Sequence, residues 1–456
     1  MSFELVSLSD IADVIDSLHK TPKYADKGWA MVRCTDVSYG YLELESTFKV
    51  EEIVYNEFSR RYKPEKNDLI ITRVGSYGLT ALVDDTEFCL GQNTSAIKPK
   101  INAKYLYLCL NSSFVQRQIE SKVVGTTQKT LSLKAIKSLL IPRFGDYKED
   151  CIADIGWNLN DKIYANRRIN HTLEQMAQAL FKSWFVDFEP VKAKIAVLES
   201  GGSQEEATLA AMTAISGKDA GSLAVFEQAY PEKYAELSST AELFPSAMRD
   251  IESAKIPEGW DLVPLSNIAS FASGKIDVSE LTKDTYISTE NMLVNKIGIE
   301  CATSLPSAST TPSFNPGHIL ISNIRPYFKK IWLARFSGGR SADVLAFEHK
   351  KHITAEYLYN ILYQDSFFDF MMQTSKGVKM PRGDKQAIME WSCIEPTVEL
   401  ASVFSNKVKE FYSYIESHNK ENTQLSQLRD TLLPKLLSGE ITLPEAEEIA
   451  KEADYV

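Results

Sequence analysis

Most signatures of catalysis are missing from this chain of 456 residues. No two prolines are adjacent, which excludes the Asn/Asp-Pro-Pro-Tyr/Phe tetrad of adenine methyltransferases. Neither Gly217-Lys218 nor Gly274-Lys275 is followed by Ser or Thr, and no Gly-x-Gly-x-x-Gly or Gly-x-Ser-x-Gly motif occurs. The sequence therefore predicts a protein with no catalytic residues of its own.

Paired cysteines and long apolar runs are also missing. The six cysteines form no Cys-x-x-Cys pair, which favours reduced thiols over a disulfide framework or a zinc site. No run approaches the roughly 18 apolar residues of a membrane span. The stretch "MSFELVSLSD" has neither a basic region nor an apolar region of the secretory type. We therefore expect a cytoplasmic protein with no membrane partner and no metal.

The net charge of −11 argues against a protein that simply coats nucleic acid. Residues 1–150 contain 20 basic and 20 acidic side chains, and residues 255–400 contain 15 and 16. The segments that follow these blocks are acidic. Because binding depends on local potential, each near-neutral block can still present a basic face.

The sequence contains an internal repeat. "VSLSDIA" (6–12) returns as "VPLSNIA" (263–269), and "NDLIITRVGSY" (67–77) returns as "GHILISNIRPY" (317–327). Farther along each half, apolar residues recur at an offset of 252; Leu159 and Ile163, for example, correspond to Phe411 and Ile415. We infer a tandem duplication in which each half is a mixed domain followed by a long helix.

The expected fold class is α+β, with two pseudo-symmetric halves. Short β-like runs precede apolar-periodic helices at 104–119 and 356–372, and a final strand ends at Pro142 or Pro396. The expected segments are a first mixed domain (1–145), a long helix (146–189), a partly mobile helical linker (190–255), a second mixed domain (256–397), a second long helix (398–440) and an acidic tail (441–456).

Each long helix carries apolar residues three and four apart, which is typical of a coiled-coil strand. The expected seam consists of Leu159, Ile163, Asn170, Leu173, Met176, Leu180, Trp184, Phe411, Ile415, Asn422, Leu425, Leu428, Leu432 and Leu436. Asn170 and Asn422, 252 residues apart, either fix the register from buried positions or lie on the exposed flank. Pro434 predicts a kink or restart, and Ser438-Gly439 predicts the end of the second helix.

Polar, basic and aromatic residues gather in loops of both mixed domains. Arg and Lys suit guanine edges and phosphates, and Asn and Gln suit adenine. The candidate DNA-binding residues are Arg60, Arg61, Lys63, Arg73, Ser76, Tyr77, Thr127, Gln128, Lys129, Thr130, Asn323, Arg325, Tyr327, Lys329, Lys330, Lys376, Lys379 and Arg382. The alternative is that these are ordinary solvated loops.

Two weaker constellations suggest a metal-dependent enzyme. His349 and His352 lie three residues apart in a charged stretch, which is more often a solvated turn than a ligand pair. Asp343, Glu348 and Lys350 are the ingredients of a nuclease, although the aspartate is unusually near the glutamate. The first half has no counterpart of this trio.

The sequence resembles the specificity subunits of type I restriction-modification systems. The resemblance rests on the half-repeat, on "LEQMAQALFKSWFVDFEPVKAK" (173–194), on "FPSAMRDIESAKIPEGW" (244–260) and on "LLPKLLSGEI" (432–441). It implies two target recognition domains, each reading one part of a bipartite, asymmetric site in double-stranded DNA, and long helices that pair antiparallel.

The resemblance also implies partners. Two modification (methyltransferase) subunits would dock on the helices and carry S-adenosylmethionine, and restriction subunits would supply ATP- and Mg-dependent translocation and cleavage, so this chain itself would bind no cofactor. Related binding readings are an orphan DNA reader and an anti-restriction mimic, which the acidic charge favours. The competing enzyme reading is a stand-alone endonuclease centred on Asp343, Glu348 and Lys350.

Overall fold

The computed structural model describes residues 4–125, 129–251, 254–377 and 379–452. It divides into two compact units, one built from two separate segments and the other from a single continuous segment. The first comprises Met1–Asn170 with Glu416–Val456, and the second comprises His171–Ile415. Each long helix therefore contributes its first part to one unit and its last part to the other.

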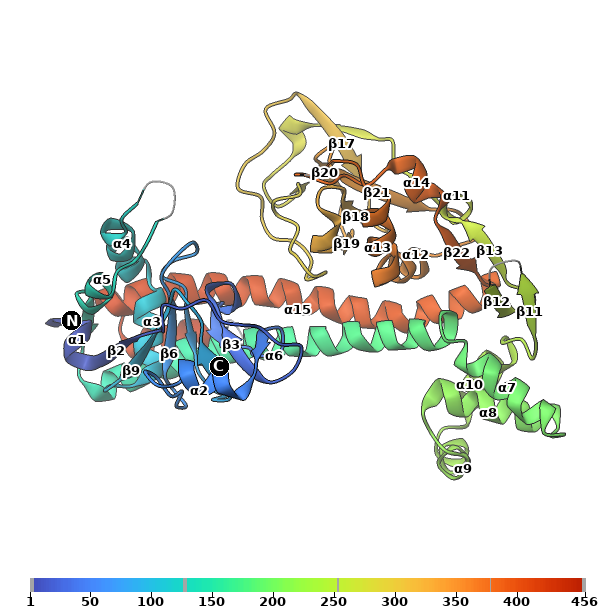
Figure 1. Cartoon of the computed structure of the whole chain (residues 1–456), viewed down its shortest axis with the longest axis horizontal. Helices are drawn as coiled ribbons and strands as arrows, with labels where there is room; N and C mark the ends of the chain where they lie inside the picture. Colours follow the sequence, from blue (N-terminus) through green and yellow to red (C-terminus); the bar gives the residue numbers. More distant parts are fainter. Residues whose placement is uncertain (1–3, 126–128, 252–253, 378, 453–456) are drawn as a thin grey trace. The chain divides into compact units, whose positions relative to one another are not determined.

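The first mixed domain is built on a five-stranded sheet of order β2-β9-β6-β7-β4, with smaller sheets β5-β3-β8 and β1-β10 (Figure 1). The strands are β1 (Glu4–Ser7), β2 (Ala12–Asp16), β3 (Trp29–Val32), β4 (Gly40–Tyr41), β5 (Phe48–Val50), β6 (Leu69–Thr72), β7 (Thr80–Leu82), β8 (Phe88–Leu90), β9 (Thr94–Pro99) and β10 (Leu140–Arg143). The helices are α1 (Leu8–Ile11), η1 (Cys34–Asp36), α2 (Glu52–Phe58), α3 (Ala103–Asn111), α4 (Ser113–Lys122) and α5 (Leu133–Lys137).

The second mixed domain has sheets β14-β21-β18-β19, β15-β17-β20-β16 and β13-β22. Its strands are β13 (Asp261–Pro264), β14 (Ala269–Phe271), β15 (Lys275–Asp277), β16 (Tyr286–Ile287), β17 (Thr310–Phe314), β18 (Ile319–Ser322), β19 (Ile331–Leu333), β20 (Gly338–Arg340), β21 (Val344–His349) and β22 (Ser392–Glu395). Its helices are α11 (Leu265–Ile268), η2 (Val278–Glu280), η3 (Pro326–Phe328), α12 (Ala355–Leu362), α13 (Asp365–Gln373) and α14 (Lys385–Glu390).

The two domains share one topology. The order β2-β9-β6-β7 of the first is repeated as β14-β21-β18-β19 in the second, with every pairing antiparallel. In both domains the first and last strands pair, and the last strand leads into a long helix. The duplication read from the sequence is therefore present in the fold, and helix α2 is an addition of the first copy.

The helix expected at 104–119 is broken into α3 and α4. Ser112 has an extended backbone (φ −70°, ψ 151°), and its Oγ accepts a hydrogen bond from Val115 N at the start of α4. Gln364, also extended, similarly precedes α13 and breaks the helix expected at 356–372. The apolar periodicity runs through both breaks because the two helices beside each break contribute buried residues to the same core.

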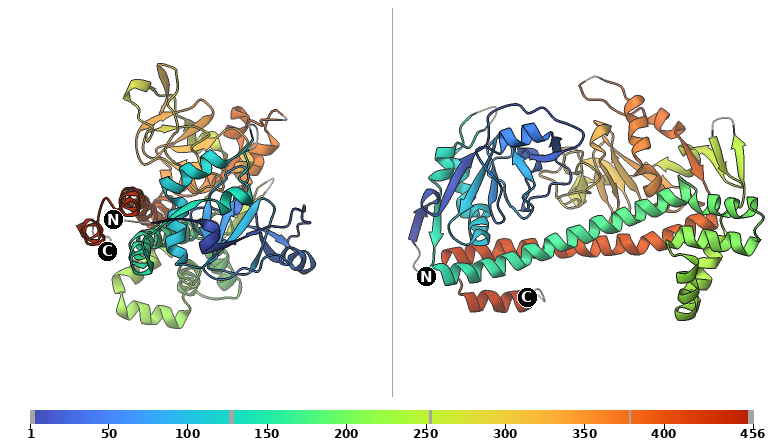
Figure 2. Two further views of the ribbon diagram at one scale, coloured as in Figure 1. Left: turned by 90° about the vertical axis from the view of Figure 1, so that its left-hand side faces the viewer. Right: turned by 60° about the horizontal axis from the view of Figure 1, so that its bottom comes forward.

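The long helices are α6 (Asp146–Phe185) and α15 (Val398–Ser438), and within each unit they lie side by side and antiparallel (Figure 2). In the first unit, Leu159 and Ile163 pack against Leu425. Farther along, Asn166 Nδ2 donates to Asn422 Oδ1 at 3.0 Å, and Asn170 Nδ2 donates to Asn419 Oδ1 at 3.0 Å. In the second unit, Phe181, Trp184 and Phe185 pack edge-on around Phe404.

Burial along the expected seam is uneven. Its buried members are Leu159, Ile163, Trp184, Leu425, Leu432 and Leu436, and its half-buried members are Asn170, Leu173, Leu180, Phe411, Ile415, Asn422 and Leu428. The seam prediction is wrong for Met176, which is 49% exposed, because the helix turns the neighbouring Ala177 inward. Asn166, which the heptad pattern missed, is buried, and its Nδ2 donates to Glu421 Oε2 at 2.6 Å.

Pro434 does not interrupt α15, so the expected restart is wrong. The helix ends at Ser438, as expected, where Gly439 adopts φ +74° and Glu440 N donates to Lys435 O at 2.9 Å. Leu433 and Leu437 of this last part belong to the core of the first domain, together with Trp157. Correspondingly, the end of α6 belongs to the core of the second domain.

The linker folds into helices with a small core of their own. They are α7 (Glu189–Glu199), α8 (Gln204–Ser216), α9 (Ala220–Ala229) and α10 (Pro231–Glu242), followed by the hairpin β11 (Met248–Ile251) and β12 (Ala254–Pro257). Lys194 of α7 is buried and donates to Phe244 O at 2.7 Å. The acidic tail contains α16 (Leu443–Glu452). Among the described residues, no helix combines the length and the hydropathy needed to cross a membrane.

Candidate nucleic-acid interface

Two candidate loops, far apart in the sequence, meet in each mixed domain. In the first, Val74 and Val124 both form β-bridges with Thr130. In the second, Ile324 and Lys376 both form β-bridges with Arg382. Each domain thus joins the loop after β6 or β18 to the loop before α5 or α14. We call these the paired loops: residues 73–77 with 124–131, and 323–330 with 376–383.

Arg73 is held rigidly in the first pair of loops. Its guanidinium forms an ion pair with Asp16 at the end of β2, its Nε donates to Leu131 O at 3.0 Å, and its side chain is 12% exposed. Burial raises the pKa of Asp16, but the hydrogen bond from His19 and the charge of Arg73 outweigh it and lower the pKa overall. Arg73 therefore supports the loops with little surface left for a ligand.

The other residues of the first paired loops are mostly exposed. Glu120 accepts from Lys129 Nζ at 2.6 Å and from Tyr77 OH at 2.6 Å, which fixes both side chains at the surface. Ser76 is exposed, and Thr130 is half-buried within the bridges. Thr127 and Gln128 lie outside the described residues.

Three basic candidates of the first domain come from a different segment. Arg60, Arg61 and Lys63 follow α2 and are exposed. Arg61 Nη1 donates to Ser17 O at 3.2 Å, next to the Asp16 carboxylate that pairs with Arg73. Arg61 is thereby connected to the first paired loops through the end of β2.

In the second paired loops, amide and ammonium groups donate mainly to backbone oxygens and carboxylates. Asn323 is buried, and its Nδ2 donates to Gly383 O at 3.3 Å. Lys329 Nζ lies 3.0 Å from Asp365, and Lys330 Nζ donates to Thr289 O at 2.7 Å. Tyr327, in the same loop, is 48% exposed.

The segment 376–383 carries three further cations. Lys376 Nζ lies 2.5 Å from Asp384 Oδ2, and Arg382 Nη2 donates to Asp343 Oδ2 at 3.2 Å. Lys379 is exposed. Because carboxylates balance most of these cations, the loops offer oriented donors more than net positive charge, which suits the reading of base edges.

These carboxylates are functional neighbours that sequence reasoning missed. Asp16, Glu120, Asp343, Asp365 and Asp384 each pair with a candidate cation. Asp384 lies next to its loop and could have been noticed. Asp16, Asp343 and Asp365 lie far along the chain from their partners, and Glu120 lies on α4, nine residues before Lys129. No local pattern signals these pairs.

The metal-enzyme constellations do not assemble. Asp343 directly precedes β21 and Glu348 lies near the far end of that strand, so their Cα atoms are roughly 16 Å apart. Asp343 also pairs with Arg382, and His352 pairs with Glu395 at 3.2 Å. Within the described ranges, no group of three or more His, Cys, Asp or Glu side chains could hold a metal ion.

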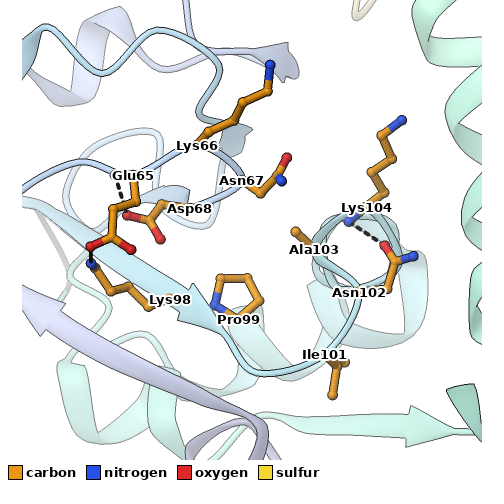
Figure 3. Close-up of a pocket in the computed structure, with 10 residues that line it drawn as sticks. All are labelled: Glu65, Lys66, Asn67, Asp68, Lys98, Pro99, Ile101, Asn102, Ala103 and Lys104. Atoms are coloured by element: carbon orange, nitrogen blue, oxygen red, sulfur yellow. Dashed lines mark hydrogen bonds and ion pairs between the residues drawn. The ribbon is translucent and has the colours of Figure 1, made fainter.

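One pocket of about 490 Å³ opens on the first domain, away from the paired loops (Figure 3). It lies between the segment before β6 and the start of α3. Three of its charged side chains are already in ion pairs: Glu65 pairs with Lys98 at 2.6 Å, and Lys66 pairs with Asp84 at 2.6 Å. We therefore assign it no ligand.

A buried polar network in the second unit connects α6 to the second domain. Gln178 Nε2 donates to Asn360 Oδ1 at 2.7 Å, and Asn360 Nδ2 donates to Tyr412 OH at 2.8 Å. Burial raises the pKa of Glu174, one turn before Gln178, to about 7, although Gln178, Arg335 and Lys296 oppose the shift. Lys296 in turn shares Asp365 with Lys329 of the paired loops.

Glu174 makes the stability of the second unit depend on pH. Because its pKa is raised on folding, the folded state holds the proton more tightly, and stability falls as pH rises from about 4.5 to about 7. Glu174→Gln mimics the protonated acid, so we expect nearly equal stability at about pH 4, below the unfolded pKa, and a gain of about 1–3 kcal/mol at pH 8. Urea titrations at both pH values measure this, with the exposed Glu410→Gln of α15 as the control. Equal effects of the two substitutions would contradict the assignment.

The chain is similar to several known proteins. A profile of the type I restriction modification DNA specificity domain matches residues 2–175. The HindI specificity subunit of a type I restriction enzyme from Haemophilus influenzae is 31% identical over 376 residues, covering 76% of this chain and 79% of that protein. The MjaIX specificity subunit of Methanocaldococcus jannaschii is 22% identical over 422 residues, covering 87% and 82%. The crystal structure of a type I restriction-modification S subunit from M. genitalium covers 96% of both chains, with 15% identity and a TM-score of 0.48.

Proposed function

Because this chain belongs to the family of type I restriction enzyme specificity subunits, whose role is non-catalytic DNA sequence specificity, we propose that its two mixed domains each read one part of a bipartite, asymmetric DNA site. One observation carries this proposal. The same pair of loops is bridged in the same way in both domains, but with different side chains. Two domains that share one loop architecture but carry different side chains are suited to recognising two different half-sites.

The alternative functions have no support from the relatives or from the geometry. The relatives are specificity subunits, not nucleases. Asp343 precedes β21, Glu348 lies within it and Lys350 follows it, so the trio is spread out along an extended segment. The hypothesis of an orphan reader or an anti-restriction mimic depended on the acidic net charge. That charge lies in the segments outside the two mixed domains.

Specificity subunits bind DNA and assemble with other subunits of their complex. We propose in addition that two modification subunits dock on α6 and α15, and that restriction subunits join the assembly. S-adenosylmethionine, ATP and Mg would then be bound by these partners, and the complex would act in the cytoplasm. The long helices support this role because they form a rigid antiparallel pair within each unit.

The test is the DNA site itself. The chain is produced together with a type I modification subunit, and methylated adenines are mapped across the genome of the host. We expect one motif with two defined parts separated by a fixed number of undefined bases. A continuous motif, or no sequence-dependent methylation by an active complex, would contradict two readers in this chain.

A further inference from the structure

At one position of the paired loops, the two copies share a left-handed backbone but differ in how favourable that backbone is for the residue present. Val74 and Ile324 occupy matching bridges, so the residues that follow them, Gly75 and Arg325, are equivalent. Gly75 has φ +77° and Arg325 has φ +51°. A left-handed backbone is natural for glycine and unfavourable for arginine. The second copy therefore keeps an arginine where the first copy uses the residue that the turn requires.

The turn around Arg325 holds this conformation firmly. Arg325 N donates to Pro381 O at 2.8 Å, and Phe328 N donates to Arg325 O at 2.9 Å. Pro326 follows directly, and Lys329 at the far side of the turn is also left-handed, with φ +48°. Two non-glycine residues in this region within one short turn are unusual, and such strain is concentrated at functional sites.

The guanidinium of Arg325 gains no compensation from the protein. Its Nε is buried without a hydrogen-bond partner, and no ion pair of this side chain occurs within the part of the chain that the structure describes. The neighbouring cations Lys329, Lys376 and Arg382 each pair with an aspartate. A strained, partly buried cation without a carboxylate is costly for the folded chain alone, and a bound molecule that accepts hydrogen bonds would compensate this cost.

We propose that Arg325 reads a guanine in the half-site of the second domain; this inference rests on the proposed function. Arginine donates two parallel hydrogen bonds to guanine O6 and N7, which demands a fixed side-chain direction. A phosphate contact makes no such demand, and a mobile cation such as the exposed Lys379 is sufficient for it. Because the first copy has Gly75 at the equivalent position, we expect this guanine contact only in the half-site of the second domain.

The variant Arg325→Gly separates reading from folding. Glycine restores the residue that the first copy uses and relieves the left-handed strain, so the variant should be at least as stable as the wild type in thermal unfolding. Arg325→Lys keeps the charge and removes the planar pair of donors. Lys379→Ala removes an exposed cation from the same paired loops and serves as the matched control.

The complex with the modification subunit selects its site from a library of DNA duplexes with randomised positions. For wild type we expect a bipartite motif, and for Arg325→Gly the same motif with one guanine position undefined. Discrimination at that position should fall about fivefold to hundredfold. Arg325→Lys should lose most of this discrimination while keeping its affinity, and Lys379→Ala should weaken binding evenly.

Three results would overturn the assignment. Arg325→Gly could select the full wild-type motif, could weaken binding equally at every sequence, or could unfold at a lower temperature than wild type. The second result would make Arg325 a phosphate contact, and the third a structural residue. If the wild-type complex itself selects no bipartite motif, the proposed function fails, which is a different outcome from any of these three.

Discussion

Replacing Trp184 with alanine is expected to destabilise the second unit by about 3–5 kcal/mol, the range for removing a large aromatic side chain from a core. Trp184 lies at the end of α6 and is fully buried. Its ring packs edge-on against Phe244 at 5.1 Å and against Phe404 at 6.0 Å, both in the second unit. Although the helix follows the first domain in the sequence, the loss should fall on the second.

Met176→Ala provides the control for Trp184→Ala. Met176 lies on the same part of α6, in the same unit, and is 49% exposed. It should therefore cost less than about 1 kcal/mol. Urea unfolding followed by circular dichroism measures both variants without depending on tryptophan emission. Similar losses for the two substitutions would contradict the assignment of the end of α6 to the core of the second unit.

Exchanging residues 1–145 for the same region of a related subunit is expected to change one half of the recognised site and leave the other half unchanged. This expectation follows from two separate pairs of loops, one in each domain. Mapping the methylated motif of each chimera measures it. Changes in both half-sites, or in neither, would contradict independent reading.

The structure also predicts where such a chimera is fragile. Trp157 of α6 donates to Tyr41 OH at 3.0 Å and packs against Tyr107, and Leu433 of α15 belongs to the same core. An exchange of 1–145 alone separates these partners. An exchange of Met1–Asn170 together with Glu416–Val456 keeps them together. We expect the second chimera to unfold at a higher temperature, with the same new half-site.

The sequence alone was sufficient for the duplication, for the long helices and for the specificity-subunit family. These features depend on patterns that are local or that repeat at a constant offset, such as Leu159 and Phe411. The sequence also singled out both segments of each pair of loops, because polar and basic residues concentrate there; their contact with DNA stays a prediction. The seam was predicted less well: Met176 was placed inside, and Asn166 was missed, because the heptad phase depends on the partner helix.

Only the tertiary structure decided how these parts combine. Each long helix ends in the core of the domain from the other repeat, so the first compact unit combines two segments that are distant in the sequence. The carboxylates that hold Arg73 and Lys329 also come from distant segments. The alignment of the two copies already set Gly75 opposite Arg325, but the left-handed backbone became visible only in the fold. These features depend on packing between segments that are distant in the sequence, and local residue patterns contain no information about that packing.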